Sequence, residues 1–315
     1  MSYRAVFFNE PLVVVLMATY NGARFLSAQL ESIARQNHKT WRLVISDDGS
    51  DDETLRILHD FIRSRPKGQV QLHQGLGQGT TANFRSLLRR AEVGKAHLAF
   101  CDQDDVWEPD HLSRALIMLG RAPRALAIYG TRLRVCDEDL RQIALSPLPR
   151  RPLSFSNALM QNMFSGNTMV MTPAAARLVQ TAEREAGSFP IHDWWAFQLI
   201  AGAGGMTIFD ERPGVSYRIH GANVIGWQKG WRSLSARLRR HWRGSHRQWA
   251  IENVSALSAS AGRLTPENRK VLTAFATALA TPYPLRLIAL LRSGVYFQSR
   301  KAQLAFWISA GLGRI

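Results

Sequence analysis

The stretch LVVVLMATYNG, from Leu12 to Gly22, decides the fold of this 315-residue chain. Seven apolar residues run without a break from Leu12 to Ala18, and the polar turn Thr19 to Gly22 follows at once. A short, continuous apolar run is typical of a strand that is covered on both faces, as strands in parallel sheets are. The stretch therefore predicts an interior strand with a polar turn at its carboxyl end.

Three more apolar runs predict strands at Trp41–Ser46, Val70–His73 and His97–Cys101. A helical pattern follows each strand, at Ala23–Arg35, Asp52–Arg63, Ala82–Ala91 and Pro109–Leu119. Alternation of this kind is typical of βαβ units. The first half is therefore predicted to be a Rossmann-like α/β unit, in which helices flank a mostly parallel central sheet.

Beyond Pro123 the alternation becomes irregular. Shorter strand-like patches occur at Ala125–Tyr129, Asn167–Met171, Met206–Phe209 and Gly214–Ile219, and helical patches occur after Pro173 and around Trp194. Three prolines between Leu145 and Pro152 predict an exposed connection.

The net charge of +16 is concentrated at one end of the chain. From Gly226 to Ile315 there are 15 Lys and Arg residues against two acids, so the preceding part is nearly neutral. The sequence of this tail predicts basic amphipathic helices in which tryptophans occur among the arginines. These tryptophans are Trp227, Trp231, Trp242, Trp249 and Trp307. Two interpretations stay open: attachment to an anionic membrane surface, or packing on the body with arginines toward water. No recognition motif accompanies the charge, so we expect no nucleic-acid partner.

The cysteines and the N-terminal segment favour a cytoplasmic setting. Cys101 and Cys136 lie far apart and lack the spacing of a metal site or a disulfide framework. The first ten residues lack the order of a signal peptide, and the run Leu12 to Ala18 is too short to cross a bilayer.

The acidic segment Asp102-Gln103-Asp104-Asp105 is the strongest local signal for chemistry. Ligands of open α/β sheets bind at the carboxyl ends of the strands, where this segment lies. If the strand continues through Asp104, then Asp102 and Asp104 point to one face and could share a divalent cation, Mn²⁺ or Mg²⁺. The alternative is an acidic loop in which Asp105 caps the helix that begins near Pro109.

The stretch GLGQGT, Gly75 to Thr80, is neither a Walker sequence nor a dinucleotide fingerprint, because no lysine follows its last glycine. A flexible turn into the next helix is the preferred interpretation.

The motifs ATYNG, SDDGSDDETL, GLGQGTTANFRSLL and FCDQDDVWEPD occur in this order, and the motifs IHDWW and YRIHGANVIG follow them. The ordered set, which covers about Leu12 to Gly226, resembles family 2 glycosyltransferases of the GT-A fold, and its last two motifs resemble the rhamnosyltransferase-type branch. The resemblance implies nucleotide contacts from Thr19, Tyr20, Asn21, Asp48, Asp102 and Gln103. Asp48 would accept the N3–H of a pyrimidine base, although Asp47 is an alternative or a turn former.

The resemblance places the metal on Asp102 and Asp104, with Asp104 in direct contact. His220 would join the metal or the diphosphate; a merely packed histidine is the alternative. Trp194, Trp195 and Arg218 are candidates for contacts to the sugar or the acceptor. For the tryptophans the alternative is a place in the core, and for Arg218 it is a solvated face.

Asp193 is the predicted general base, with Asp105 and Asp210 as alternatives and an N-cap as its structural interpretation. One base together with a metal-stabilised diphosphate gives single displacement and inversion. A retaining route would need a second carboxylate near the reacting carbon.

The resulting prediction is an inverting, metal-dependent enzyme that transfers a sugar, with rhamnose preferred, from a UDP- or dTDP-linked donor to a polysaccharide or lipid-linked glycan. It would work peripherally at the inner face of the cell membrane. The catalytic domain would span 1–226, with a nucleotide-binding half (1–122) and an acceptor half (123–226), and 227–315 would be a helical region. The rivals are a nucleotidyltransferase, against which the poor glycine-loop match in ATYNGAR counts, and a non-catalytic adaptor.

Overall fold

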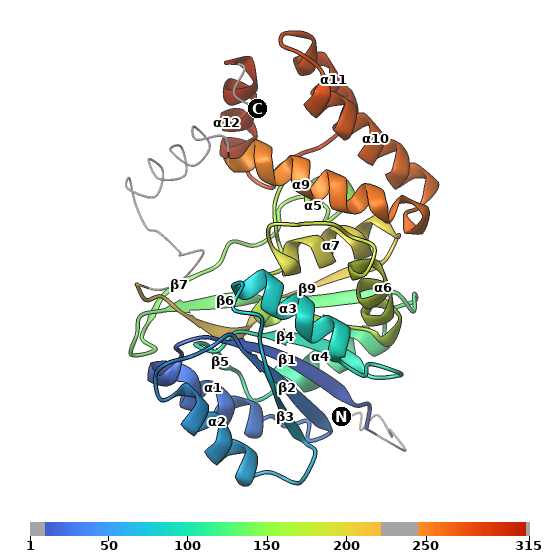
Figure 1. The fold of residues 1–315 in the computed structure, drawn as a ribbon. Coiled ribbons are helices and arrows are strands. Elements are labelled where there is room, and N and C mark those ends of the chain that lie inside the picture. The colour runs from blue at the N-terminus through green and yellow to red at the C-terminus, as the bar shows by residue number, and fades with distance from the viewer. Residues whose placement is uncertain (1–9, 222–244, 313–315) are drawn as a thin grey trace, which may run out of the picture.

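The computed structural model describes residues 10–221 and 245–312. A central sheet separates two helical layers, and the C-terminal helices extend from one of these layers (Figure 1). The strand order is β3-β2-β1-β4-β8-β6-β9-β5, and β7 pairs with β6. This mixed α/β architecture is the one predicted from the sequence.

The parallel part of the sheet comes from the first four apolar runs. Its strands are β1 (Val13–Thr19), β2 (Trp41–Asp47), β3 (Val70–Gln74) and β4 (His97–Cys101). β1 lies between β2 and β4 and is parallel to both. The run Val13 to Met17 has no exposed surface, because helices cover both of its faces. The predicted interior strand is confirmed.

The second half of the sheet is longer and more mixed than the sequence pattern indicates. Its strands are β5 (Val106–Trp107), β6 (Ala127–Cys136), β7 (Gln142–Leu145), β8 (Val170–Met171) and β9 (Met206–Arg218). β8 is antiparallel to both β4 and β6, whereas β9 is parallel to β6. The two strand-like patches after Met206 are therefore one strand, with a register shift opposite Thr131 to Leu133.

Each face of the sheet has its own core. One core contains α1 (Ala23–Ala34), α2 (Thr54–Arg63) and α4 (His111–Gly120). The other contains α3 (Thr80–Arg90), α5 (Phe155–Ala158), α6 (Pro173–Glu183) and α7 (His192–Gly202). The 3-10 turn η1 (Gly166–Thr168) leads into β8. In Figure 1 the first group lies below the sheet and α3, α6 and α7 lie above it.

The described part of the tail forms α9 (Ser245–Ala259), the 3-10 turn η2 (Ala261–Arg263), α10 (Pro266–Ala280), α11 (Leu285–Ser293) and α12 (Arg300–Gly311). Leu257, Phe275 and Phe306 are buried in the same core as α7, so these helices pack on the body. Among the predicted tail tryptophans, Trp249 and Trp307 are partly buried against this core.

Other sequence predictions lie outside the described residues, namely Trp227, Trp231, Trp242 and the motif residues 222–226. Within the described ranges, none of the helices has the length and apolar character needed to cross a membrane.

Candidate active site

The turn after β1 is held by a side chain from the acidic segment. The Gln103 amide accepts a hydrogen bond from the Tyr20 backbone N–H at 2.9 Å and donates one to the Tyr20 carbonyl, also at 2.9 Å. The Tyr20 side chain stays 57% exposed. Gln103 therefore fixes the backbone of this turn and leaves the phenol ring open to a ligand.

The turns after β1 and β2 are also tied to each other. Asn21 has a φ of 46°, a left-handed conformation that asparagine tolerates better than most residues. Its side-chain oxygen accepts from the Asp51 N–H at 3.0 Å, and its own N–H donates to the Ser50 hydroxyl at 2.9 Å. The first two polar turns thus form one rigid edge.

The neighbours Asp47 and Asp48 have different roles. Asp47 is buried and accepts hydrogen bonds from the hydroxyls of Thr19 and Ser50, at 2.8 and 2.7 Å, so it is a turn former. Asp48 accepts from the backbone N–H groups of Gly77 at 2.9 Å and Gly79 at 2.7 Å. Its side chain therefore tethers the glycine stretch.

The glycine stretch forms a turn into α3, as expected, and Asp48 tethers this turn. Gly77 and Gly79 have φ values of 65° and 85°, which turn their N–H groups toward Asp48 without the steric cost that a side chain would carry. A Cβ on Gly75 would lie 2.6 Å from an Asp48 carboxylate oxygen. The glycines allow the stretch to wrap closely around this carboxylate.

The acidic segment does not continue β4 as expected. β4 ends at Cys101, and residues 102–105 form a turn, so Asp102 and Asp104 do not share a strand face. Asp104 Oδ2 lies 2.8 Å from His220 Nε2. Burial, together with the charges of Asp105, Asp104 and Asp193, raises the pKa of Asp102 well above its usual range.

Asp105 points into the protein and does not cap a helix. It accepts hydrogen bonds from the Asn167 side-chain amide and from the Arg218 backbone N–H, the latter at 3.0 Å. Burial and the charge of Asp104 raise its pKa to about 8. Asp110, not Asp105, precedes the first residue of α4.

The predicted base Asp193 lies in the first turn of α7, one residue past the helix start, so it is not the N-cap. Its Oδ2 accepts from the Gly166 N–H at 2.7 Å and its Oδ1 from the Trp194 N–H at 2.6 Å. The side chain is only 9% exposed, and this burial raises its pKa to about 6. A carboxylate with such a pKa is mostly ionised at neutral pH and is a better proton acceptor than an exposed one.

The turn η1 connects the acidic segment to this base. Asn167 donates to Asp105, and its carbonyl accepts from the Trp107 indole N–H at 3.0 Å. Its neighbour Gly166 donates to Asp193. This connection has no signal in the sequence, whose local pattern places Asn167 in a strand-like patch.

Trp194 and Trp195 occupy the core, the second of their two predicted alternatives. Trp195 has no exposed surface and stacks on Phe189 with a centroid separation of 4.5 Å. The Trp194 indole N–H donates to the Ala158 carbonyl at 2.6 Å. Neither ring presents a face to a sugar, because neighbouring side chains cover both.

Arg218 is buried at the end of β9, so the alternative of a solvated face is wrong. Its guanidinium donates to the Asp104 carbonyl at 3.0 Å and to the Glu138 carbonyl. It also lies over the Phe25 ring, 4.5 Å from the centroid. Arg218 thus holds the backbone of the acidic segment in place at Asp104.

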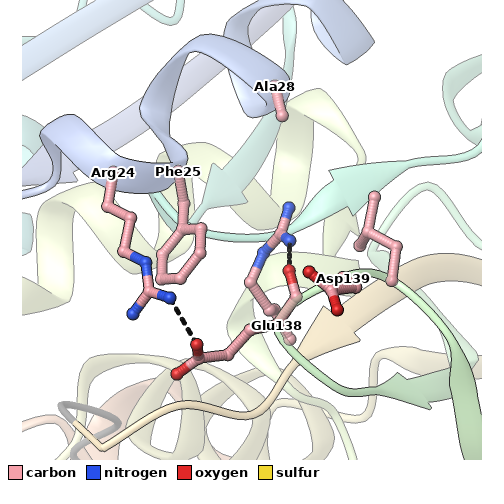
Figure 2. Close-up of a pocket in the computed structure, with 7 residues that line it drawn as sticks. Arg24, Phe25, Ala28, Glu138 and Asp139 are labelled. Carbon is pink, nitrogen blue, oxygen red and sulfur yellow. Dashed lines mark hydrogen bonds and ion pairs between the residues drawn. The ribbon is translucent and has the colours of Figure 1, made fainter.

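A pocket of about 360 Å³ opens beside this arginine. It is lined by Arg24, Phe25, Ala28, Glu138, Asp139, Leu140 and Arg218, and an Arg24–Glu138 ion pair lies at its side (Figure 2). Phe25, which lines the pocket, also contacts the His220 ring, with the two ring centroids 4.9 Å apart.

The donor atoms present fit a divalent cation. Asp104 and His220 supply a carboxylate oxygen and an imidazole nitrogen that already face each other, a combination that suits Mn²⁺. In the ranges that the structure describes, no group of three or more His, Cys, Asp or Glu side chains could hold a metal alone. Two protein ligands completed by substrate phosphates are a usual arrangement for a nucleotide-bound cation.

A mixed sheet whose parallel strands end in polar turns, carboxylates and a histidine is the architecture of an α/β protein that binds a ligand such as a nucleotide at this edge. The family model "Glycosyl transferase family 2" matches residues 14–183, which is more than half of the chain. The chain belongs to this family.

Curated relatives agree with this assignment. The dTDP-rhamnosyl transferase RfbG of Shigella flexneri is 26% identical over 240 residues, which are 70% of this chain and 78% of RfbG. An uncharacterized glycosyltransferase of Nostoc, alr2836, is 29% identical over 67% of this chain and 66% of its own length. The protein CgeD of Bacillus subtilis is 28% identical, and the match spans only 28% of it.

Solved structures share the fold. A mannosyltransferase from Pyrobaculum calidifontis, PcManGT, in complex with GDP-Man and Mn²⁺, has a TM-score of 0.53 at 22% identity, covering 97% of this chain and 87% of that one. S. aureus TarS 1–349 in complex with UDP-GlcNAc has a TM-score of 0.52 at 16% identity, covering 90% and 93%. These similarities identify the fold as GT-A, as predicted.

Proposed function

We propose that this protein is an inverting glycosyltransferase that moves a sugar from a pyrimidine nucleoside diphosphate donor to a hydroxyl of a polysaccharide or lipid-linked glycan. One observation carries the proposal: the turn η1 links the base candidate Asp193, which is bonded to Gly166, with the acidic segment, whose Asp105 is bonded to the neighbouring Asn167 and whose Asp104 faces His220.

The nucleotide would bind to the rigid edge formed by the first two turns. Tyr20 offers an exposed ring, and Thr19, Asn21 and Gln103 shape the backbone around it. Asp48 would take the N3–H of the base through the lone pairs that Gly77 and Gly79 leave open, since each carboxylate oxygen accepts more than one hydrogen bond. A relative that uses dTDP-rhamnose and a structural neighbour that holds UDP-GlcNAc support a pyrimidine donor, and the relative favours rhamnose.

Asp104 and His220 would hold Mn²⁺ or Mg²⁺, with Asp102 nearby to balance the charge. The bound cation would stabilise the negative charge of the diphosphate leaving group. The structural neighbour with Mn²⁺ and GDP-Man supports this cofactor class.

Asp193 would act on the acceptor side. As the acceptor oxygen bonds to the anomeric carbon, its proton passes to a carboxylate oxygen of Asp193, and the bond from that carbon to the diphosphate oxygen breaks with its electron pair. A single displacement of this kind inverts the anomeric centre. The N–H groups of Gly166 and Trp194 hold the carboxylate in place and leave lone pairs for the proton.

The acceptor class and the charge of the tail lead us to propose a working place at the inner face of the cell membrane. Residues 1–226 would form the catalytic domain, in the two halves already named, and 227–315 the helical region that meets the membrane.

The test is calorimetric titration of the full chain with dTDP, UDP and GDP, in Mn²⁺ and in EDTA, followed by turnover assays with the matching nucleotide sugars. Tight binding of a pyrimidine nucleotide that depends on the metal supports the proposal. Equal affinity in Mn²⁺ and EDTA would contradict the metal site, and preference for GDP would contradict the pyrimidine pocket.

A further inference from the structure

The helices α11 and α12 lie at the end of the molecule farthest from the sheet (Figure 1), and each of them has exposed apolar side chains. On α11 these are Leu285, Ile288 and Leu291, spaced three residues apart; on α12 they are Leu304, Ile308 and Leu312, spaced four apart. Such spacings place each set on one stripe of its helix. All six are between 50% and 63% exposed, whereas the buried sides of the helices hold Leu290 and Phe306.

This clustering is unusual among the described residues. Of the 14 large apolar side chains that are exposed, seven lie between Tyr283 and Leu312. Single exposed apolar residues are ordinary, but three of them along one side of a helix, on each of two helices, indicate a surface that meets a partner or a lipid.

The charge around the stripes decides between these occupants. From Asn268 to Ile315 the chain has seven Lys and Arg residues and no acid. Exposed Arg292 adjoins the α11 stripe, and exposed Lys301 lies one turn before Leu304 on α12. A second copy of this chain would bring like charges together at such a surface, whereas an anionic lipid headgroup layer complements it.

We infer that the outer stripes of α11 and α12 are the membrane-docking surface of this protein, with leucine and isoleucine inserted among anionic headgroups. The inference names the surface by which the proposed enzyme would bind the membrane, so it rests on the proposed function. It also moves the docking surface away from Trp249 and Trp307, since these rings pack against the core.

The test compares full-length variants in co-sedimentation with phosphatidylglycerol and phosphatidylcholine vesicles. Ile288→Gln with Leu291→Gln keeps every charge and alters only exposed positions. It should lower partitioning into phosphatidylglycerol vesicles about tenfold or more, because even partial burial of two such side chains contributes that much. Ile117→Gln, at an exposed apolar position on α4, is the matched control and should partition like the wild type.

Each outcome bears on the inference. Equal partitioning of the double variant and the wild type would overturn it, as would a wild type that ignores phosphatidylglycerol at low salt. A dimer in analytical ultracentrifugation that the double variant abolishes would assign the stripes to a second copy instead. Metal-dependent nucleotide binding is measured on the same preparations, so a failed transferase assignment is distinguished from a failed docking surface.

Discussion

Replacing Asp193 by Asn tests the proposed base with the smallest change in shape. The carboxylate is buried at the start of α7, with a pKa of about 6. At pH 7 about 90% of it would be ionised and ready to accept a proton. The amide cannot accept that proton, so turnover should fall by about 10² to 10⁴ while donor-nucleotide affinity stays unchanged.

Asp193→Asn lowers turnover, but removing the buried charge raises the free energy of unfolding. The size of this gain follows from the pKa of Asp193. The pKa of Asp193 is raised from 3.8 to about 6, so the folded state binds a proton more tightly than the unfolded state. The protonated carboxyl therefore makes its full contribution to the free energy of unfolding below about pH 4, and this contribution is lost as the pH rises through 6. At neutral pH, ionising the buried group costs about 3 kcal/mol, which Asn removes.

Asn also loses one acceptor, so one of the N–H groups of Gly166 and Trp194 would lack a partner, at about 1–3 kcal/mol. The two effects nearly cancel. We therefore expect a melting temperature within a few degrees of the wild type.

The assay is a pH series of kcat/KM for transfer, with melting curves and nucleotide titrations on the same preparations. The wild type should lose about tenfold in kcat/KM for each pH unit below 6, and the residual rate of the variant should lack this acidic limb. A folded variant that binds nucleotide and transfers sugar at the wild-type rate would refute the role of Asp193. The alternative bases would then be Asp105, which accepts a hydrogen bond from Asn167, and Asp210, which accepts one from Tyr129.

Three further changes probe other parts of the structure. Asp104→Asn should weaken Mn²⁺-dependent nucleotide binding by at least about 10- to 100-fold and leave the weak EDTA affinity unaltered, as titration would show. Gly166→Ala would place a Cβ 3.1 Å from Asp193 Cβ, so kcat should drop about 100-fold with little change in nucleotide affinity; unchanged kcat would mean that the base is not held by η1. Glu183→Gln removes a fully buried carboxylate that forms ion pairs with both Arg85 and Arg89, and urea unfolding should show a loss of about 1–3 kcal/mol without any effect on KM.

The parallel half of the sheet could be predicted from the sequence because local pattern and tertiary environment agree there. Helices cover both faces of β1, so its apolar run is continuous and its bounds shift by only one residue from those expected. β9 shows the opposite case. Polar residues and a proline at 210–213 interrupt its pattern, yet its pairing with β6 continues across a register shift that no local periodicity encodes.

The sequence indicated which types of residue the candidate site contains, but not how they are arranged in space. Asp104 and His220 are 116 positions apart, and only the pairing of β9 with its neighbours brings them within 2.8 Å. α7 is buried on every side, so its sequence lacks the amphipathic pattern that would have assigned Trp194 and Trp195 to the core. The sequence indicated a loop at Gly75 to Thr80, but not that Asp48 tethers it.

The acidic segment after β4 is where the two halves of the sheet meet. Burial, and after it the charges of neighbouring carboxylates, raises the pKa of Asp102 and of Asp105 above the usual range. Each side chain has a different direction: Asp104 faces His220 at the end of β9, and Asp105 reaches Asn167 beside the base. A cation between the carboxylates and a diphosphate would relieve the repulsion at the moment the donor binds. The charges gathered in the acidic segment would therefore favour binding of the donor together with its cation, close to the proposed base Asp193.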